Sequence, residues 1–341
     1  MMMDGGSTAE TQSPGVREDV PPAVVATYQG AYRQFLSAAI FPFTFAMFIG
    51  AGMIALKQGL PPQWLSPLAV PPFVLWVSFL ERYHPYVRAW NQDHGDTRSD
   101  LAHLVVSAVL TPQAVTWLLT ALLVPLGGML AARFDWYVWP SHWPILVQLV
   151  LALCISEFGG YWAHRLQHEI PWMWRLHAAH HGAARLYWLN AARFHPFDMA
   201  LLAGSGFAPL ILLGCPPETM ALTLMFAGMH GTFQHANIHV KLGFLNWFFS
   251  AAELHRWHHS RSIEESSTNY SGHVLLWDIV FRTRFLPKDR LPPCDIGIAG
   301  MPTFPNDYIE QLKSPFTLDR LQENQPAPAP IVRPVPSSEA S

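Results

Sequence analysis

His164-Arg-Leu-Gln-His168 is the first of four short histidine clusters that lie between Glu157 and Asn269. The other three clusters read His177-Ala-Ala-His180-His181, His235-Ala-Asn-Ile-His239 and His255-Arg-Trp-His258-His259. Spacings of i, i+4 and of i, i+3, i+4 place the imidazoles of one cluster on one face of a helix. Imidazole is a ligand for iron, zinc, copper and nickel. The four clusters hold more imidazoles than one ion accepts, so the pattern predicts two metal ions.

The composition indicates a membrane protein. Half of the 341 residues are hydrophobic, 13% are charged, and the mean hydropathy is +0.16. Soluble domains carry about 25% charged residues. The net charge of −3 gives no reason to expect a nucleic acid as partner. The three cysteines are far apart and lack CxxC spacing, which argues against a disulfide framework or a Cys-rich zinc site.

Four apolar segments are long enough to cross a bilayer, and they predict an all-α, multi-pass transmembrane bundle within residues 31–156 and just beyond. These segments are 35–56, 64–80, 101–130 and 143–162. The third segment is long enough to be one tilted span or two pieces broken at Thr111-Pro112, and we favour one span plus an interfacial piece. Two further apolar runs, 199–215 and 219–233, predict a hairpin that either re-enters the membrane or spans it.

The remaining segments complete the expected organisation. Residues 242–252 are apolar and aromatic, so we expect them in the membrane interface. The composition of residues 1–30 and 322–341 predicts disordered tails. With four spans, most arginines fall on one side of the membrane, and Lys57 and Arg133 fall on the other. The positive-inside rule then predicts that both termini and all four histidine clusters are cytoplasmic.

Glu157 and Tyr161 share a helical stripe with His164 and His168. An acidic residue inside an apolar run is costly and indicates a function. Histidines that bind metal usually donate their second ring N–H to a carboxylate or a carbonyl. Glu157 and Tyr161 suit that supporting role, although a polar contact between two helices would explain them equally well.

The clusters and their flanking residues resemble the fatty acid hydroxylase/sterol desaturase superfamily over residues 157–286. The matching motifs are His164-Arg-x-x-His168, Trp174-Arg-x-His177-x-x-His180-His181, Phe233-Gln-His235-x-Asn-Ile, Glu253-x-His255-Arg-x-His258-His259, Asn269-Tyr270 and Trp277-Asp278. The resemblance implies a catalytic domain, 157–290, in which a cytosolic helical cap holds a di-metal site, normally two irons. By position, the implied ligands are His164, His168, His177, His180, His181, His235, His239, His255, His258 and His259.

The resemblance also implies the activity. Such enzymes activate O2 and hydroxylate or desaturate a lipid chain, a sterol or a lipid head group, and we favour hydroxylation. His195 in Arg193-Phe-His195-Pro resembles a recurrent element of the family. The residues expected to support the ligands are Glu157, Tyr161, His195, Asn237 and Asn269.

The electron supply and two other functions remain open. The chain has no His-Pro-Gly-Gly haem element and no Gly-x-Gly-x-x-Gly at a strand-to-helix turn, so we expect a separate ferredoxin, cytochrome or reductase. A membrane haem protein would need histidines that face each other within spans, whereas these lie at span ends. A zinc protein or metal transporter is the other alternative. The sequence leaves open which lipid is the substrate.

Overall fold

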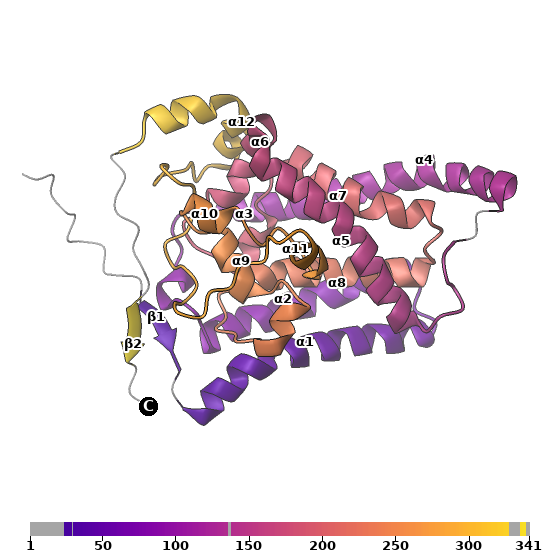
Figure 1. Cartoon of the computed structure of the whole chain (residues 1–341), viewed down its shortest axis with the longest axis horizontal. Helices are drawn as coiled ribbons and strands as arrows, with labels where there is room; N and C mark the ends of the chain where they lie inside the picture. The colour runs from indigo at the N-terminus through magenta and orange to yellow at the C-terminus, as the bar shows by residue number, and fades with distance from the viewer. Residues whose placement is uncertain (1–23, 29, 136–137, 327–334, 339–341) are drawn as a thin grey trace, which may run out of the picture.

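The computed structural model describes residues 24–28, 30–135, 138–326 and 335–338 (Figure 1). Helices dominate this part of the chain, as predicted. The elements, in chain order, are β1 Val24–Thr27, α1 Ala31–Lys57, η1 Pro62–Trp64, α2 Leu65–Tyr83, η2 Arg88–Asn91, α3 Thr97–His103, η3 Leu104–Leu110, α4 Thr111–Phe134, α5 Ile145–Glu169, α6 Pro171–His181, η4 Trp188–Ala192, α7 Pro196–Leu212, α8 Pro217–His235, η5 Gly243–Trp247, α9 Ala252–His258, α10 Ile263–Ser266, α11 Leu276–Val280, α12 Tyr308–Glu323 and β2 Val335–Ser338.

Four helical stretches of the described chain are long and apolar enough to cross a membrane. They are Ala31–Lys57, Pro62–Tyr83, Thr97–Phe134 and Ile145–Glu169. No residue in the most apolar window of the third stretch is buried, and Trp117 and Leu122 are 69% and 60% exposed. A large exposed apolar surface marks a site of interaction with a membrane or a protein, and the membrane length of these helices favours the membrane. The chain is therefore an integral membrane protein.

The third stretch differs from the prediction, because Thr97–Phe134 is one continuous helix of 38 residues with no break at Thr111-Pro112. Leu104–Leu110, directly before this pair, is a π-helix. The wider turn accommodates Pro112, which has no N–H to donate, and the Thr111 hydroxyl bonds the Val106 carbonyl at 2.9 Å. At about 1.5 Å per residue the helix is far longer than a bilayer core is thick, so its ends extend beyond it.

Helices α7 and α8 correspond to the two predicted apolar runs and are joined by a short turn at residues 213–216; whether they span the membrane or re-enter it stays a prediction. Helix α7 packs against α4 and α5 (Figure 1). A side chain at Gly159 of α5 would overlap the backbone carbonyl of Ser205, so a glycine here allows the two helices to approach closely. This crossing brings the first turn of α7 towards the histidines of α5 and α6.

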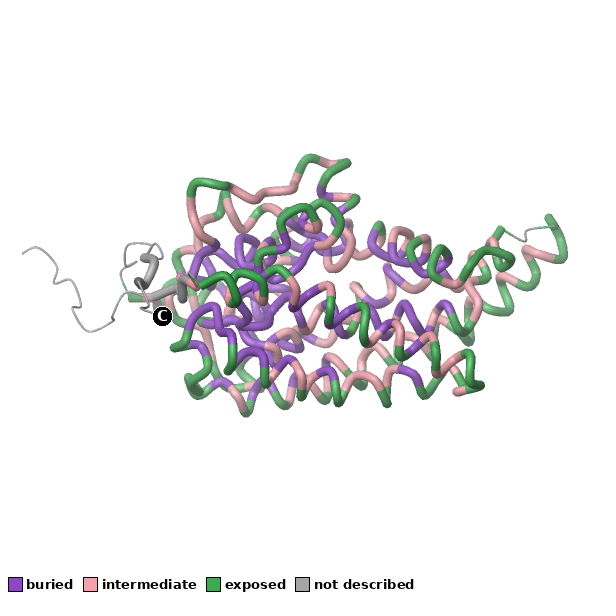
Figure 2. Tube along the Cα trace, turned by 90° about the horizontal axis from the view of Figure 1, so that it is seen from below, coloured by how far each residue is buried: buried purple, intermediate pink, exposed green. Residues whose placement is uncertain are grey.

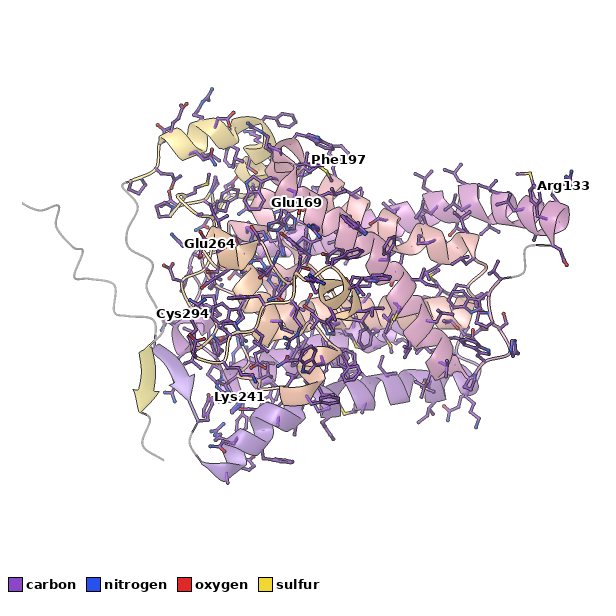
Figure 3. All side chains as sticks on the ribbon, viewed as in Figure 1. Arg133, Glu169, Phe197, Lys241, Glu264 and Cys294 are labelled. Carbon is purple, nitrogen blue, oxygen red and sulfur yellow. The ribbon has the colours of Figure 1, made fainter. Side chains whose placement is uncertain are left out.

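The largest hydrophobic core joins α1, α2 and α8 through residues such as Phe41, Phe45, Phe73 and Met225. Figure 2 shows the buried residues gathered towards one end of the molecule, whereas the far ends of the long helices are mostly exposed or half-buried. Arg133 marks the far end, and Glu169, Glu264 and Cys294 lie towards the other (Figure 3). All four histidine clusters therefore lie at the packed end.

The described parts of the two predicted tails meet at the packed end. Strands β1 and β2 pair in parallel, from Val24 opposite Val335 to Thr27 opposite Ser338. The C-terminal segment is helical to Glu323 in α12. Most of both tails lies outside the described residues, so their disorder stays a prediction. The same applies to the cytoplasmic orientation of this end.

Candidate metal centre

Nine of the ten predicted ligands come together in two adjacent groups. The first group contains His164, His168, His177, His181 and His258. The second contains His180, His235, His255 and His259, and the candidate ligand atoms of each group lie within 4.8 Å of one another. The stacked rings of His181 and His259 are 4.4 Å apart and join the two groups. Each group could hold one ion, and the number of ions stays a prediction.

Helix geometry explains how neighbouring histidines enter different groups. Consecutive residues on a helix point about 100° apart, whereas residues i and i+4 point about 40° apart. On α6, His177 and His181 therefore face the first group and His180 faces the second. On α9 the division is reversed, because His258 joins the first group while the other two histidines join the second. Each His-x-x-His-His motif thus contributes to both groups.

His239 lies outside both groups. The prediction placed it one helical turn after His235, but α8 ends at His235 and Ala236 turns to an extended conformation. The chain carries His239 away, and its Nδ1 hydrogen bonds Ser37 Oγ at 2.9 Å, beside His84. The structure therefore does not support His239 as a ligand.

The hydrogen bonds of the first group show that its Nε2 atoms are arranged for a cation. His164 Nδ1 donates to the Tyr270 carbonyl at 2.7 Å, and His177 Nδ1 donates to Asp198 at 2.9 Å. Both protons are thereby assigned to Nδ1, which leaves a lone pair on each Nε2. These two lone pairs face each other at 3.1 Å, where they repel each other unless a positive ion lies between them. Two nitrogens, each about 2.1 Å from one ion and at right angles, are about 3.0 Å apart.

The second group converges in the same way. His255 Nε2 lies 3.0 Å from Nε2 of both His235 and His259. His235 donates its Nδ1 proton to the Asn190 side-chain oxygen at 2.9 Å, which leaves its Nε2 free to bind a metal. Among the described residues, His168 Nε2 in the first group and Nδ1 of both His255 and His259 have no hydrogen-bond partner. Ligation through Nε2 would satisfy His168 Nε2 and would separate the facing Nε2 atoms of the second group, so the residues fit metal ions.

Burial keeps these imidazoles neutral, as metal ligands must be. The pKa values of His180, His181, His255, His258 and His259 are all lowered well below 6.5. Desolvation is the main cause, and neighbouring imidazoles add to it because several positive rings cannot share one buried space. A neutral imidazole offers a lone pair, so the site is ready for metal at neutral pH.

Backbone carbonyls, one amide and one carboxylate orient the rings, and the sequence did not point to most of them. Asp198 is wholly buried in the first turn of α7 and also accepts a hydrogen bond from Gln167 at 2.6 Å. An acid at the start of an otherwise uncharged apolar helix was the signal that could have revealed it. His258 Nδ1 donates to the Thr268 carbonyl at 2.7 Å, and His180 Nδ1 faces the Arg193 carbonyl at 3.2 Å.

The five residues predicted to support the ligands form no hydrogen bonds with the clustered histidines. Glu157 accepts from Gly272 N–H at 2.6 Å, and the Tyr161 hydroxyl lies 2.9 Å from Thr283 Oγ1. The other three form hydrogen bonds with the backbone. His195 accepts from Phe197 N–H, Asn237 bonds both the N–H and the carbonyl of Val87, and Asn269 donates to the Leu254 and Phe285 carbonyls. They hold the segments that carry or orient the ligands.

A buried ion network fixes the loop that follows α6. Arg193 Nε lies 2.6 Å from Asp100, which also accepts from the Tyr187 hydroxyl at 2.8 Å. Arg185 pairs with Asp96 at 2.6 Å. These side chains are at most 8% exposed. Because the Arg193 carbonyl faces His180, the network couples the base of the long α3–α4 helix to the second histidine group.

We expect Asp198→Asn to weaken metal binding by about 10–100-fold, because the amide no longer fixes the charge and tautomer of His177. Competition with a chelator on purified protein measures this affinity. Asp319→Asn is the matched control, because Asp319 pairs with Arg175 at the surface. Wild-type affinity in Asp198→Asn would contradict the role of this carboxylate.

A bundle of membrane-length helices with two histidine groups suited to metal ions defines a class of membrane protein, and comparisons identify the family. The fatty acid hydroxylase family matches residues 149–283. The chain is 31% identical over 293 residues to ornithine lipid hydroxylase OlsE of Rhizobium tropici, covering 85% of this chain and 87% of that protein. The chain therefore belongs to the fatty acid hydroxylase/sterol desaturase superfamily and is an oxidoreductase, as predicted.

Two more distant relatives match over shorter regions. Alkylglycerol monooxygenase of Homo sapiens is 32% identical over 160 residues, which are 47% of this chain and 34% of that protein. Methylsterol monooxygenase 2-2 of Arabidopsis thaliana is 27% identical over 150 residues, 42% of this chain and 54% of that protein. A comparison with solved structures found no match. The relatives differ in the substrates in their names.

Proposed function

We propose that this chain is a membrane-bound, O2-dependent lipid hydroxylase whose two histidine groups hold two iron ions. The observation that carries this proposal is the pair of lone-pair nitrogens of His164 and His177, 3.1 Å apart, within two adjacent groups of buried imidazoles. Nitrogen ligands suit iron, and neutral ones leave the ions strongly electrophilic. Membership of a family that contains hydroxylases and monooxygenases favours oxygen chemistry over zinc binding.

Iron bound at these positions would supply the activation of O2 and the removal of hydrogen from an unactivated C–H bond. The chain itself contributes ligand orientation and exclusion of water. Eight of the nine imidazoles are buried, and Tyr270 and Thr268 carbonyls hold two of them through Nδ1. Burial matters because water would quench a reactive oxidant before it meets the substrate.

We further propose that the substrate is a lipid and that an amino-acid lipid is the first candidate. The relative matched along most of both chains is an ornithine lipid hydroxylase. Because His164 and His168 lie near the C-terminal end of the membrane-length helix α5, we propose that the lipid approaches the histidine groups from the bilayer. The names of the relatives favour hydroxylation over desaturation. The boundaries 31–156 and 157–290 for the membrane and catalytic regions belong to this proposal.

The electron donor in this proposal is a separate ferredoxin, cytochrome or reductase that docks at the packed end. A haem protein fits the geometry poorly. Haem takes two axial ligands on opposite faces of a wide ring, whereas here nitrogens of facing imidazoles lie about 3 Å apart.

Metal analysis with an optical spectrum, followed by turnover under isotopically labelled oxygen, tests the function. We expect two irons per chain, no haem band, and a lipid product that gains one labelled oxygen atom. A product that loses two hydrogens without gaining oxygen would identify a desaturase. Zinc alone after expression with ample iron, or no oxidised lipid with any donor, would overturn the proposal.

A further inference from the structure

A second polar cluster lies on the membrane side of the histidine groups and is not used by the chemistry above. It consists of Glu157 on α5, His230 on α8, and His273 in the segment before α11. His273 Nδ1 lies 2.6 Å from Glu157 Oε2, and the rings of His230 and His273 are 5.9 Å apart. We propose that these three residues form a binding site for the amino group of a lipid substrate, a proposal that rests on the function above.

Among the described residues, two hydrogen-bond acceptors of this cluster have no hydrogen-bond partner, Glu157 Oε2 and His230 Nε2. His230 Nδ1 donates to the Gly272 carbonyl at 3.0 Å, so its Nε2 carries a lone pair. His230 is fully buried, and this Nε2 has no partner among the described residues. His273 Nδ1 lies 2.6 Å from Glu157 Oε2 without forming a hydrogen bond, so among the described residues this carboxylate oxygen also has no hydrogen-bond partner. A group rich in N–H donors would complement this set.

Charge favours an ammonium over a neutral donor. Glu157 is 1% exposed, and within the described part of the chain neither lysine nor arginine pairs with it. A buried carboxylate without a permanent cation is costly. An ammonium would neutralise it and donate to His230 as well. An anionic head group would add like charge.

The surroundings of His230 also suit an organic cation. Phe41, Phe45 and Phe226 surround its ring at centroid distances of 5.7, 5.5 and 5.4 Å. Aromatic faces attract cations and tolerate the methylene groups beside them. A Cβ at Gly160, one turn from Glu157, would meet only the Glu157 carboxylate, at 4.0 Å. The glycine thus leaves open space beside the acid.

The position of the cluster matches a substrate that reaches the irons. His230 precedes His235 by five residues on α8, which is about 7.5 Å along a helix, and Glu157 precedes His164 by seven, about 10 Å. An amino group bound here would place a carbon several bonds away beside the histidine groups. The cluster therefore selects both the kind of lipid and the carbon that is oxidised.

Binding without turnover tests the inference. The probes are an N-acyl ornithine lipid with a free side-chain amine and the same lipid with that amine acetylated. Iron-loaded full-length protein in nanodiscs, without reductant, should bind the free amine about 10–100-fold more tightly, the ratio that a hydrogen bond to a charged group supports. Glu157→Gln and His230→Phe should remove most of this preference while leaving the affinity for the acetylated lipid unchanged.

Control variants separate recognition from structure. His230→Gln keeps an acceptor and should retain much of the preference, and His142→Phe changes an exposed histidine before α5 and should retain all of it. Equal affinity of the wild type for the two lipids, or equal loss of both in the variants, would overturn the inference. If His230→Phe loses iron, Glu157→Gln alone decides the outcome. Iron content and oxygenated product test the proposed function separately, because neither depends on the amine preference.

Discussion

His258→Ala removes metal from the protein and lowers lipid oxidation by at least about a hundredfold. Replacing a residue that only supports a ligand lowers metal affinity or activity by about 10–100-fold, so the loss of a ligand itself should reach at least the upper end of that range. His258 is the single ligand that α9 supplies to the first histidine group, and its Nε2 lies 3.1 Å from that of His181. Membrane insertion should persist, because it depends on the apolar spans. Metal per chain, turnover, and recovery in the membrane fraction are the measurements.

His239→Ala is the matched control. His239 also belongs to one of the four histidine clusters but contacts Ser37 instead of the metal groups, so this variant should keep its metal. A His239→Ala protein as poor in metal as His258→Ala would contradict the ligand set of nine. A His258→Ala protein with full iron and full turnover would contradict the metal centre itself.

Asp100→Ala destabilises the protein by about 3–5 kcal/mol, the cost of removing the hydrogen-bonded partner of a buried charge, because Arg193 then keeps only Asp96, 3.6 Å away. Asp100 is wholly buried and compensates the guanidinium of Arg193, which is 1% exposed. The substitution also leaves the Tyr187 hydroxyl without its acceptor. Thermal unfolding in detergent, followed by the midpoint temperature, measures the effect.

Glu310→Ala provides the comparison for Asp100→Ala. Glu310 pairs with Lys313 on the surface of α12, with both side chains more than half exposed. Such a pair contributes about 0–1 kcal/mol. Similar shifts in the two variants would show that the buried network does not stabilise the fold.

The sequence predicted the features that depend on periodicity and on exact motifs. Apolar length identified all four spans, and histidine spacing on helices identified nine residues that the structure brings together. Both signals are local, because a helix converts spacing into direction without reference to the rest of the fold. The family followed from the order of the motifs.

The remainder depends on where helices end and on contacts distant in sequence. The pair His235 and His239 has the spacing of a helical face, but the helix ends at the first of them. Asp198 reaches His177 only because α7 folds back against α5. The partners of Arg193 lie 93 residues earlier in the chain, where no local pattern points to them. Tertiary packing decides such contacts.

The segments around α6 and α9 each carry histidines of both groups. This sharing limits any substitution that is meant to alter one group alone. His180 and His181 are neighbours in sequence yet serve different groups, and so do His258 and His259. A rotation of either helix would therefore move histidines of both groups at once. A substitution that repositions one group is thus expected to disturb the other.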